Sequence, residues 1–140
     1  MPIFHLDLLD DGGPRDAALP KKLADDFGRL FGAETGHVWV RVTYCPPSEY
    51  AENGDGAIPR WAFVRVILRT LPPEVPPSAG RKTIPASEAL AGRAHAIASI
   101  VSQHTGRALD DVHVYFDPPA IGRIAFGGVL VGTYSDGAGD

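Results

Sequence analysis

The apolar residues of this chain recur with two periods, and each period predicts a type of secondary structure. Residues 3–9 form a short apolar run that we interpret as a β-strand, and the turn-forming residues 10–14 follow it. Between residues 16 and 31 apolar side chains recur every three or four positions, which predicts an amphipathic helix that stops at Gly32. Over 38–44, the valines at 38, 40 and 42 alternate strictly with Trp39, Arg41 and Thr43, which predicts a half-buried strand.

The second half of the chain repeats this plan. Strand-like runs at 61–70 and 112–116 flank a segment, 87–105, whose apolar residues have helical spacing. A glycine-ended tail follows the last strand of each half at the same distance, at 48–54 in the first half and at 122–128 in the second. The sequence therefore predicts two tandem β-α-β units.

These units define the expected fold class and domain organisation. A chain of 140 residues is expected to form one domain, residues 1–140. We assign 3–54 to the first unit, 61–131 to the second and 133–140 to a flexible tail. Right-handed connections make the strands of each unit parallel, so we predict an α+β fold with one four-stranded mixed sheet and two helices on one face. A proline-rich insertion between Leu71 and Pro85 interrupts the second unit.

Alternation along the predicted strands places successive side chains on opposite faces of the sheet. The face toward the helices collects Val38, Val40, Val42, Val64, Val66, Leu68, Val112, Val114 and Phe116. The other face mixes aromatic and cationic residues, namely Trp39, Arg41, Phe63, Arg65, Ile67, Arg69, His113 and Tyr115. A monomer rarely exposes such a face, so we expect another sheet to cover it in an oligomer. A solvated face that tolerates aromatic residues is the alternative.

Composition and charge exclude several classes of partner. The net charge of −4 offers no basic footprint for nucleic acid or an anionic membrane, so we expect neither partner. The single cysteine, Cys45, cannot form an internal disulfide or a cysteine cluster, and we do not favour it as a catalytic thiol. No apolar run reaches the roughly 20 residues of a membrane span, and no signal peptide is recognisable, so we expect a cytoplasmic protein.

Metal chemistry is not indicated either. The histidines at 5, 37, 95 and 104 are widely spread and have no metal-ligand spacing, so we treat them as structural and expect no metal site.

The second residue of the chain, Pro2, is the strongest candidate for chemistry. Removal of Met1 would leave a secondary amine, and a terminal amine titrates near 7.7–8.0, far below lysine at about 10.4. Modest desolvation therefore makes it a free base at neutral pH, as a proton shuttle requires. If Met1 stays attached, the nitrogen is an amide and is not basic. A proline that merely begins an edge strand is the structural alternative.

The starting proline, the tandem units and the tail Gly122–Gly128 together resemble the tautomerase superfamily, over nearly the whole chain to about residue 131. That superfamily includes 4-oxalocrotonate tautomerase, 5-carboxymethyl-2-hydroxymuconate isomerase and macrophage migration inhibitory factor. Residues 61–64 followed by 79–81 look most like the second of these, whereas the tail looks more like the first. The resemblance implies a homotrimer in which three four-stranded sheets surround a channel, and it implies catalysis without a cofactor.

The resemblance also suggests substrate-binding residues. Arg81 matches by position the arginine that holds the substrate carboxylate in the carboxymethyl-hydroxymuconate isomerase pattern, and we assign it to catalysis with Pro2. A solvated loop arginine is the alternative. Arg69, at the end of the third strand, is the second choice, although it could instead pair across the oligomer interface. Arg15 resembles the arginine after the first strand of 4-oxalocrotonate tautomerase, and a surface charge is the alternative.

Four further positions complete the predicted substrate site. Where 4-oxalocrotonate tautomerase has an arginine in its second strand, this chain has Trp39 in the first half and His113 in the second, which is a departure that bears on specificity. Tyr50 falls at the position of that enzyme's aromatic pocket wall, and packing of the tail would explain it equally well. Arg123 lies beside the corresponding position of the second half.

Three functions from different classes follow. The first is an isomerase, a cofactor-free keto-enol tautomerase that moves a proton on a small 2-oxo or 2-hydroxydienoic acid with Pro2 as general base. The second uses a protonated Pro2 beside a carboxylate, such as Glu52 or Asp117, for hydration, dehalogenation or decarboxylation of an unsaturated or 3-oxo acid. The third is a non-catalytic ligand-binding or structural oligomer on the same scaffold.

Overall fold

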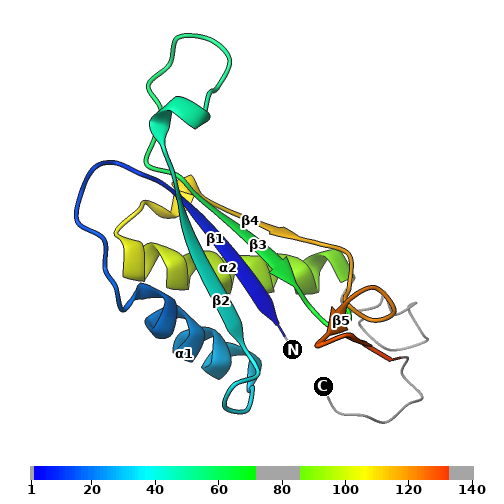
Figure 1. The fold of residues 1–140 in the computed structure, drawn as a ribbon. Coiled ribbons are helices and arrows are strands. Elements are labelled where there is room, and N and C mark those ends of the chain that lie inside the picture. The colour runs from blue at the N-terminus through cyan, green and yellow to red at the C-terminus, as the bar shows by residue number, and fades with distance from the viewer. Residues whose placement is uncertain (1, 72–85, 133–140) are drawn as a thin grey trace, which may run out of the picture.

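A computed structural model describes residues 2–71 and 86–132 of the chain (Figure 1). Its helices and strands are β1 (Ile3–Leu9), α1 (Leu19–Phe31), β2 (Trp39–Cys45), β3 (Ala62–Ile67), α2 (Ala86–Thr105), β4 (Val112–Phe116), β5 (Ala125–Phe126) and β6 (Val129–Leu130). Most of the predicted proline-rich insertion, with Arg81, and the predicted tail 133–140 lie outside the described residues.

The four long strands form one mixed sheet in the order β2-β1-β3-β4. Strand β1 runs parallel to β2, and β3 runs parallel to β4, as expected for two β-α-β units. The units meet through antiparallel pairing of β1 with β3, and both helices cover the same face of the sheet (Figure 1). The predicted fold class is confirmed.

The ends of two elements differ from the sequence-based ranges for local reasons. Helix α1 begins at Leu19 with Pro20 in its first turn, and Gly32 ends it in the left-handed region at φ 61°. The third strand ends at Ile67 rather than at residue 70, because β1 begins at Ile3, the pairing partner of Ile67. The carbonyls of Leu68 and Arg69 instead accept hydrogen bonds from the loop at 120–121.

The core lies between the sheet and the helices. Side chains from the central strands, including Phe4 and Val64, are fully buried, as are Leu23 and Phe27 of α1 and Ile97 of α2. The rings of Phe4 and Phe27 stack with centroids 4.0 Å apart. The helix-facing set predicted from alternation belongs to this core or packs against it.

The opposite face, which we call the open face, carries a row of basic residues across three strands. His5 of β1 pairs in register with Arg41 of β2 and with Arg65 of β3. Arg65 Nε donates a hydrogen bond of 2.6 Å to Asp117. Burial lowers the pKa of His5, and the positive charges of Arg41 and Arg65 lower it further, although Asp117 opposes them. Tyr115 beside this row is 47% exposed, so the mixed face predicted from alternation is present.

The depressed pKa of His5 predicts a pH-dependent stability. Because the folded state holds this imidazole neutral below its ordinary pKa of 6.5, the unfolded state binds more protons as the pH falls through 6.5. The free energy of unfolding should therefore decrease between pH 7.5 and pH 5.5 more steeply for the natural protein than for His5→Gln. Urea denaturation at several pH values measures this difference. Parallel pH curves for the two proteins would contradict the prediction.

Candidate active site

The antiparallel pairing of β1 with β3 gives the sheet two chemically different ends. The start of β1 lies against the end of β3, because Ile3 pairs with Ile67. The start of β3 lies against the end of β1, and the N–H of Leu9 donates to the carbonyl of Trp61 at 3.2 Å. We call these the proline end, which holds Pro2, and the tryptophan end, which holds Trp61.

The proline end places Pro2 beside the start of β2. The carbonyl of Pro2 accepts a hydrogen bond of 3.2 Å from the N–H of Trp39, and Pro2 is half-buried. The Trp39 ring meets the ring of Phe126 edge-on, with centroids 5.2 Å apart, while its Nε1 donates to the carbonyl of Gly36. In Figure 1 the N-terminus lies next to β5, the strand that carries Phe126. Pro2 therefore lies next to an aromatic pair.

Two predicted arginines belong to segments that reach the proline end. Arg69 lies two residues after the end of β3, and its carbonyl accepts a hydrogen bond of 3.1 Å from the N–H of Ile121. Arg123 lies in the turn between this contact and the β5–β6 hairpin, and its N–H donates to the carbonyl of Ala120 at 2.9 Å. The second unit thus places Arg69 and Arg123, in addition to Phe126, in segments that reach the proline end.

The tryptophan end collects the other predicted aromatic residues. Trp61 is only 1% exposed, and the rings of Tyr50 and Phe63 lie 4.6 Å and 4.9 Å from its ring. The ring of His113 follows at 5.1 Å from that of Phe63. Within one chain the structure therefore does not bring Tyr50 or His113 to Pro2, because the length of β1 separates them.

Arg15 also lies at the tryptophan end. Its guanidinium stands 4.1 Å over the ring of Tyr44, near the end of β2, and it forms a 2.9 Å ion pair with Asp10. The loop that follows β1 carries Arg15, so this residue and Pro2 flank opposite ends of the same strand. Within one chain Arg15 is thus a partner of Asp10 and Tyr44 rather than of Pro2.

The two carboxylates considered for hydration chemistry are both engaged. The hydroxyl of Tyr50 donates to Glu52 at 2.6 Å, and this contact raises the pKa of Tyr50. Asp117 accepts the 2.6 Å hydrogen bond from Arg65 on the open face of the sheet. Glu52 therefore belongs to the tryptophan end, and Asp117 is paired with a cation.

Phe126 is a site candidate that the sequence reasoning missed. The two units exchange their tails: Tyr50, in the first tail, packs on Trp61 at the start of the second unit, whereas Phe126, in the second tail, packs on Trp39 beside Pro2. The available signal was the repeat itself, because two similar units joined by antiparallel strands place the tail of each beside the start of the other.

Metal and thiol chemistry find no support in the part of the chain that the structure describes. No group of three or more histidine, cysteine or acidic side chains gathers there in a way that could hold a metal ion. Desolvation raises the pKa of the Cys45 thiol, and the carboxylates of Asp7 and Glu49 add to this shift, which disfavours a reactive thiolate. No helix among the described residues is long and apolar enough to cross a membrane.

Comparisons of the sequence with family models and with curated proteins find no match. Comparison of the structure with solved structures does find matches, and each covers most of this chain. A native fused 4-OT superposes with a TM-score of 0.65 at 22% identity, covering 92% of this chain and 95% of the other. Pt0534 inactivated by 2-oxo-3-pentynoate gives a TM-score of 0.63 at 16% identity, covering 92% and 94%.

A third match extends the likeness to another branch. Macrophage migration inhibitory factor from Oncomelania hupensis gives a TM-score of 0.64 at 13% identity, covering 94% of this chain and 83% of the other. The match spans both β-α-β units, as do those to the fused 4-OT and Pt0534. The fold expected from the starting proline and the tandem units is thereby confirmed, and this chain has the fold of the fused 4-OT, Pt0534 and macrophage migration inhibitory factor structures.

Proposed function

We infer that this protein is a cofactor-free tautomerase that moves a proton on a small 2-oxo or 2-hydroxydienoic acid, with Pro2 as general base. The observation that carries this proposal is the setting of Pro2, which is half-buried beside Trp39 at the start of a tautomerase fold. A structure with the same fold, Pt0534, is inactivated by 2-oxo-3-pentynoate, a small unsaturated 2-oxo acid. A related acid is therefore a reasonable substrate class to test.

The chemistry requires only a base and a cation. Once Met1 is removed, the Pro2 nitrogen takes the proton from the hydroxyl of the substrate enol and returns it to a carbon of the same substrate. Substrate and product are therefore isomers, and no other reactant is consumed. The aromatic pair Trp39–Phe126 lowers the local polarity, which disfavours the ammonium form of the amine. A guanidinium holds the substrate carboxylate and stabilises charge on the enolate oxygen.

The cation comes from the second unit in this proposal. Arg69 and Arg123 are candidates because their segments reach the proline end, and Arg81, which lies outside the described residues, keeps its assignment from the family resemblance. Arg15, Tyr50 and His113 remain substrate-binding candidates only as contributions from a neighbouring chain. The open face with His5, Arg41 and Arg65 suits such a neighbour, since a homotrimer would cover it.

One prediction of the proposed function concerns Pro2 itself. General-base catalysis contributes roughly 10²–10⁴-fold to a rate, so Pro2→Ala should lower kcat/KM for ketonisation of phenylenolpyruvate by about that factor. Pro20→Ala, which changes a proline in the first turn of α1, is the matched control and should keep the rate. Intact mass must also show loss of the Met1 residue. An unchanged rate in Pro2→Ala, or a retained Met1, contradicts the proposal and favours a non-catalytic scaffold.

A second prediction concerns the carboxylate anchor. Arg69→Ala should lower kcat/KM by about 10–100-fold, mainly by raising KM, because a charge-assisted hydrogen bond contributes roughly 1.5–3 kcal/mol. Arg69→Lys should recover part of this loss, because lysine keeps the charge without the planar fork. Arg29→Ala, near the end of α1, is the control. If Arg69→Ala matches the natural protein, the anchor lies elsewhere, with Arg81 and Arg123 the next variants.

A third prediction concerns the assembly. Light scattering coupled to gel filtration should give three times the chain mass of 14.9 kDa. Tyr115→Lys, which adds a charge to the open face, should reduce this mass, whereas Lys21→Glu on the exposed surface of α1 should not. A monomeric natural protein would contradict the trimer and would leave Arg15, Tyr50 and His113 without a role in the site.

A further inference from the structure

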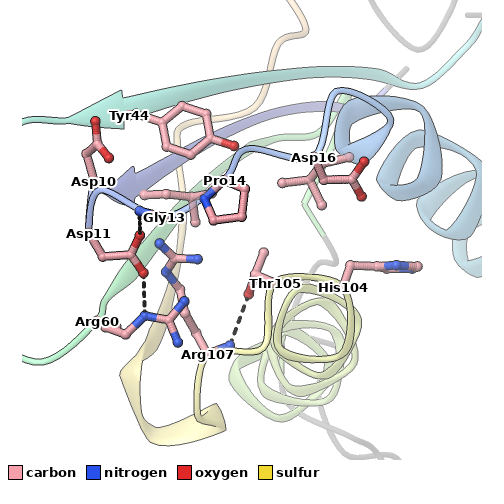
Figure 2. Close-up of a pocket in the computed structure, with 12 residues that line it drawn as sticks. Asp10, Asp11, Gly13, Pro14, Asp16, Tyr44, Arg60, His104, Thr105 and Arg107 are labelled. Atoms are coloured by element: carbon pink, nitrogen blue, oxygen red, sulfur yellow. Dashed lines mark hydrogen bonds and ion pairs between the residues drawn. The ribbon is translucent and has the colours of Figure 1, made fainter.

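A cavity lies at the tryptophan end, on the helix side of the sheet, away from Pro2. Its volume is about 320 Å³, within the range of small-molecule sites. The loop after β1, the end of β2 and the end of α2 surround it, and residues that line it include Asp11, Pro14, Tyr44, Arg60, Thr105 and Arg107 (Figure 2). None of the residues proposed for the proline end lines this cavity.

The buried wall of the cavity is a guanidinium. Arg107 is only 7% exposed, although it is a charged residue just beyond the end of α2. Its Nε donates to the carbonyl of Trp61 at 3.2 Å, and its Nη2 donates to the carbonyl of Leu9 at 2.8 Å. Both bonds use the same edge of the planar group, so the remaining N–H groups on the edge formed by Nη1 and Nη2 make no hydrogen bond to a described residue.

The acidic side chains around the cavity form ion pairs with cations other than Arg107. Each acidic side chain of the cavity wall already holds its own cation, in the ion pairs Asp10–Arg15 at 2.9 Å, Asp11–Arg60 at 2.7 Å and Asp16–Lys22 at 2.9 Å. Within residues 2–71 and 86–132, no carboxylate lies within ion-pair distance of Arg107. Burial lowers the pKa of Arg107, and the charge of Arg60 adds to the shift, although Asp11 and Tyr44 oppose it. A bound anion would stabilise the charged form of this buried guanidinium.

We propose that this cavity binds a small oxyanion, the carboxylate or phosphate group of a small molecule, on the Nη1–Nη2 edge of Arg107. The planar fork of arginine matches two oxygens of either group. Arg60 stands next to Arg107 in the same wall, and it reaches the site while it remains tied to Asp11 (Figure 2). The proposal does not depend on the proposed tautomerase activity.

Calorimetric titration of the full chain with inorganic phosphate and, separately, with benzoate tests the proposal. At least one probe should bind, and Arg107→Met should weaken that binding by at least tenfold. Asp11→Asn should tighten it several-fold, since removal of this carboxylate frees Arg60 for the anion. Asp25→Asn, which breaks the exposed Lys21–Asp25 pair elsewhere on α1, is the matched control and should change nothing. Tighter phosphate binding identifies a phosphate ligand, and tighter benzoate binding identifies a carboxylate.

Other outcomes overturn the proposal. If neither probe binds, or if Arg107→Met and Asp11→Asn both bind as the natural protein does, Arg107 is only a clamp between the carbonyls of Leu9 and Trp61. If circular dichroism shows that Arg107→Met does not fold, anion binding by Asp11→Asn and Arg60→Gln tests the proposal instead. Asp11→Asn should bind the anion more tightly, and Arg60→Gln should bind it more weakly. Pro2→Ala should keep the affinity of the Arg107 site, so failure of the catalytic proposal and failure of this one are distinguishable.

Discussion

The antiparallel pairing of β1 with β3 is the interaction on which the rest of the structure depends. It joins two parallel β-α-β units into one sheet, and its register brings Ile3 opposite Ile67. The start of each unit therefore lies at the end of the other. Because both helices pack on the same face, Phe4, Val64 and their neighbours form one core, and the opposite face is left with its cations and aromatic rings.

The same pairing explains why the two ends have different chemistry. At the proline end the first unit begins with Pro2, and the tail of the second unit supplies Phe126 against Trp39. At the tryptophan end the equivalent space is filled by Trp61, with Tyr50 packed on its ring. The two units have nearly the same fold, whereas the residues at the proline end differ from those at the tryptophan end. The first end carries the proline that we propose as the base, and beside the second lies a cavity whose wall includes the buried Arg107.

Much of the architecture could be predicted, because it follows from local periodicity. Alternation at Val38, Val40 and Val42 separated the faces of a strand, and helical spacing followed by Gly32 marked a helix and its end. These patterns involve residues only a few positions apart, so they can be recognised in a single sequence. The candidate site could be predicted only in part: Pro2 and Trp39 are neighbours, whereas Tyr50, which belongs to the first unit, lies at the other end of the chain's sheet.

The sequence by itself determined the order of the elements, the two faces of the sheet, and the starting proline as the candidate base. Only the tertiary structure decided which tail meets which end, that Phe126 packs on Trp39 at the start of β2, and that Arg107 lies buried without an ion pair among the described residues. The physical reason is distance along the chain. Periodicity reports contacts between residues a few positions apart, whereas the pairs Trp39–Phe126 and Leu9–Arg107 form across most of the chain through the register of β1 and β3.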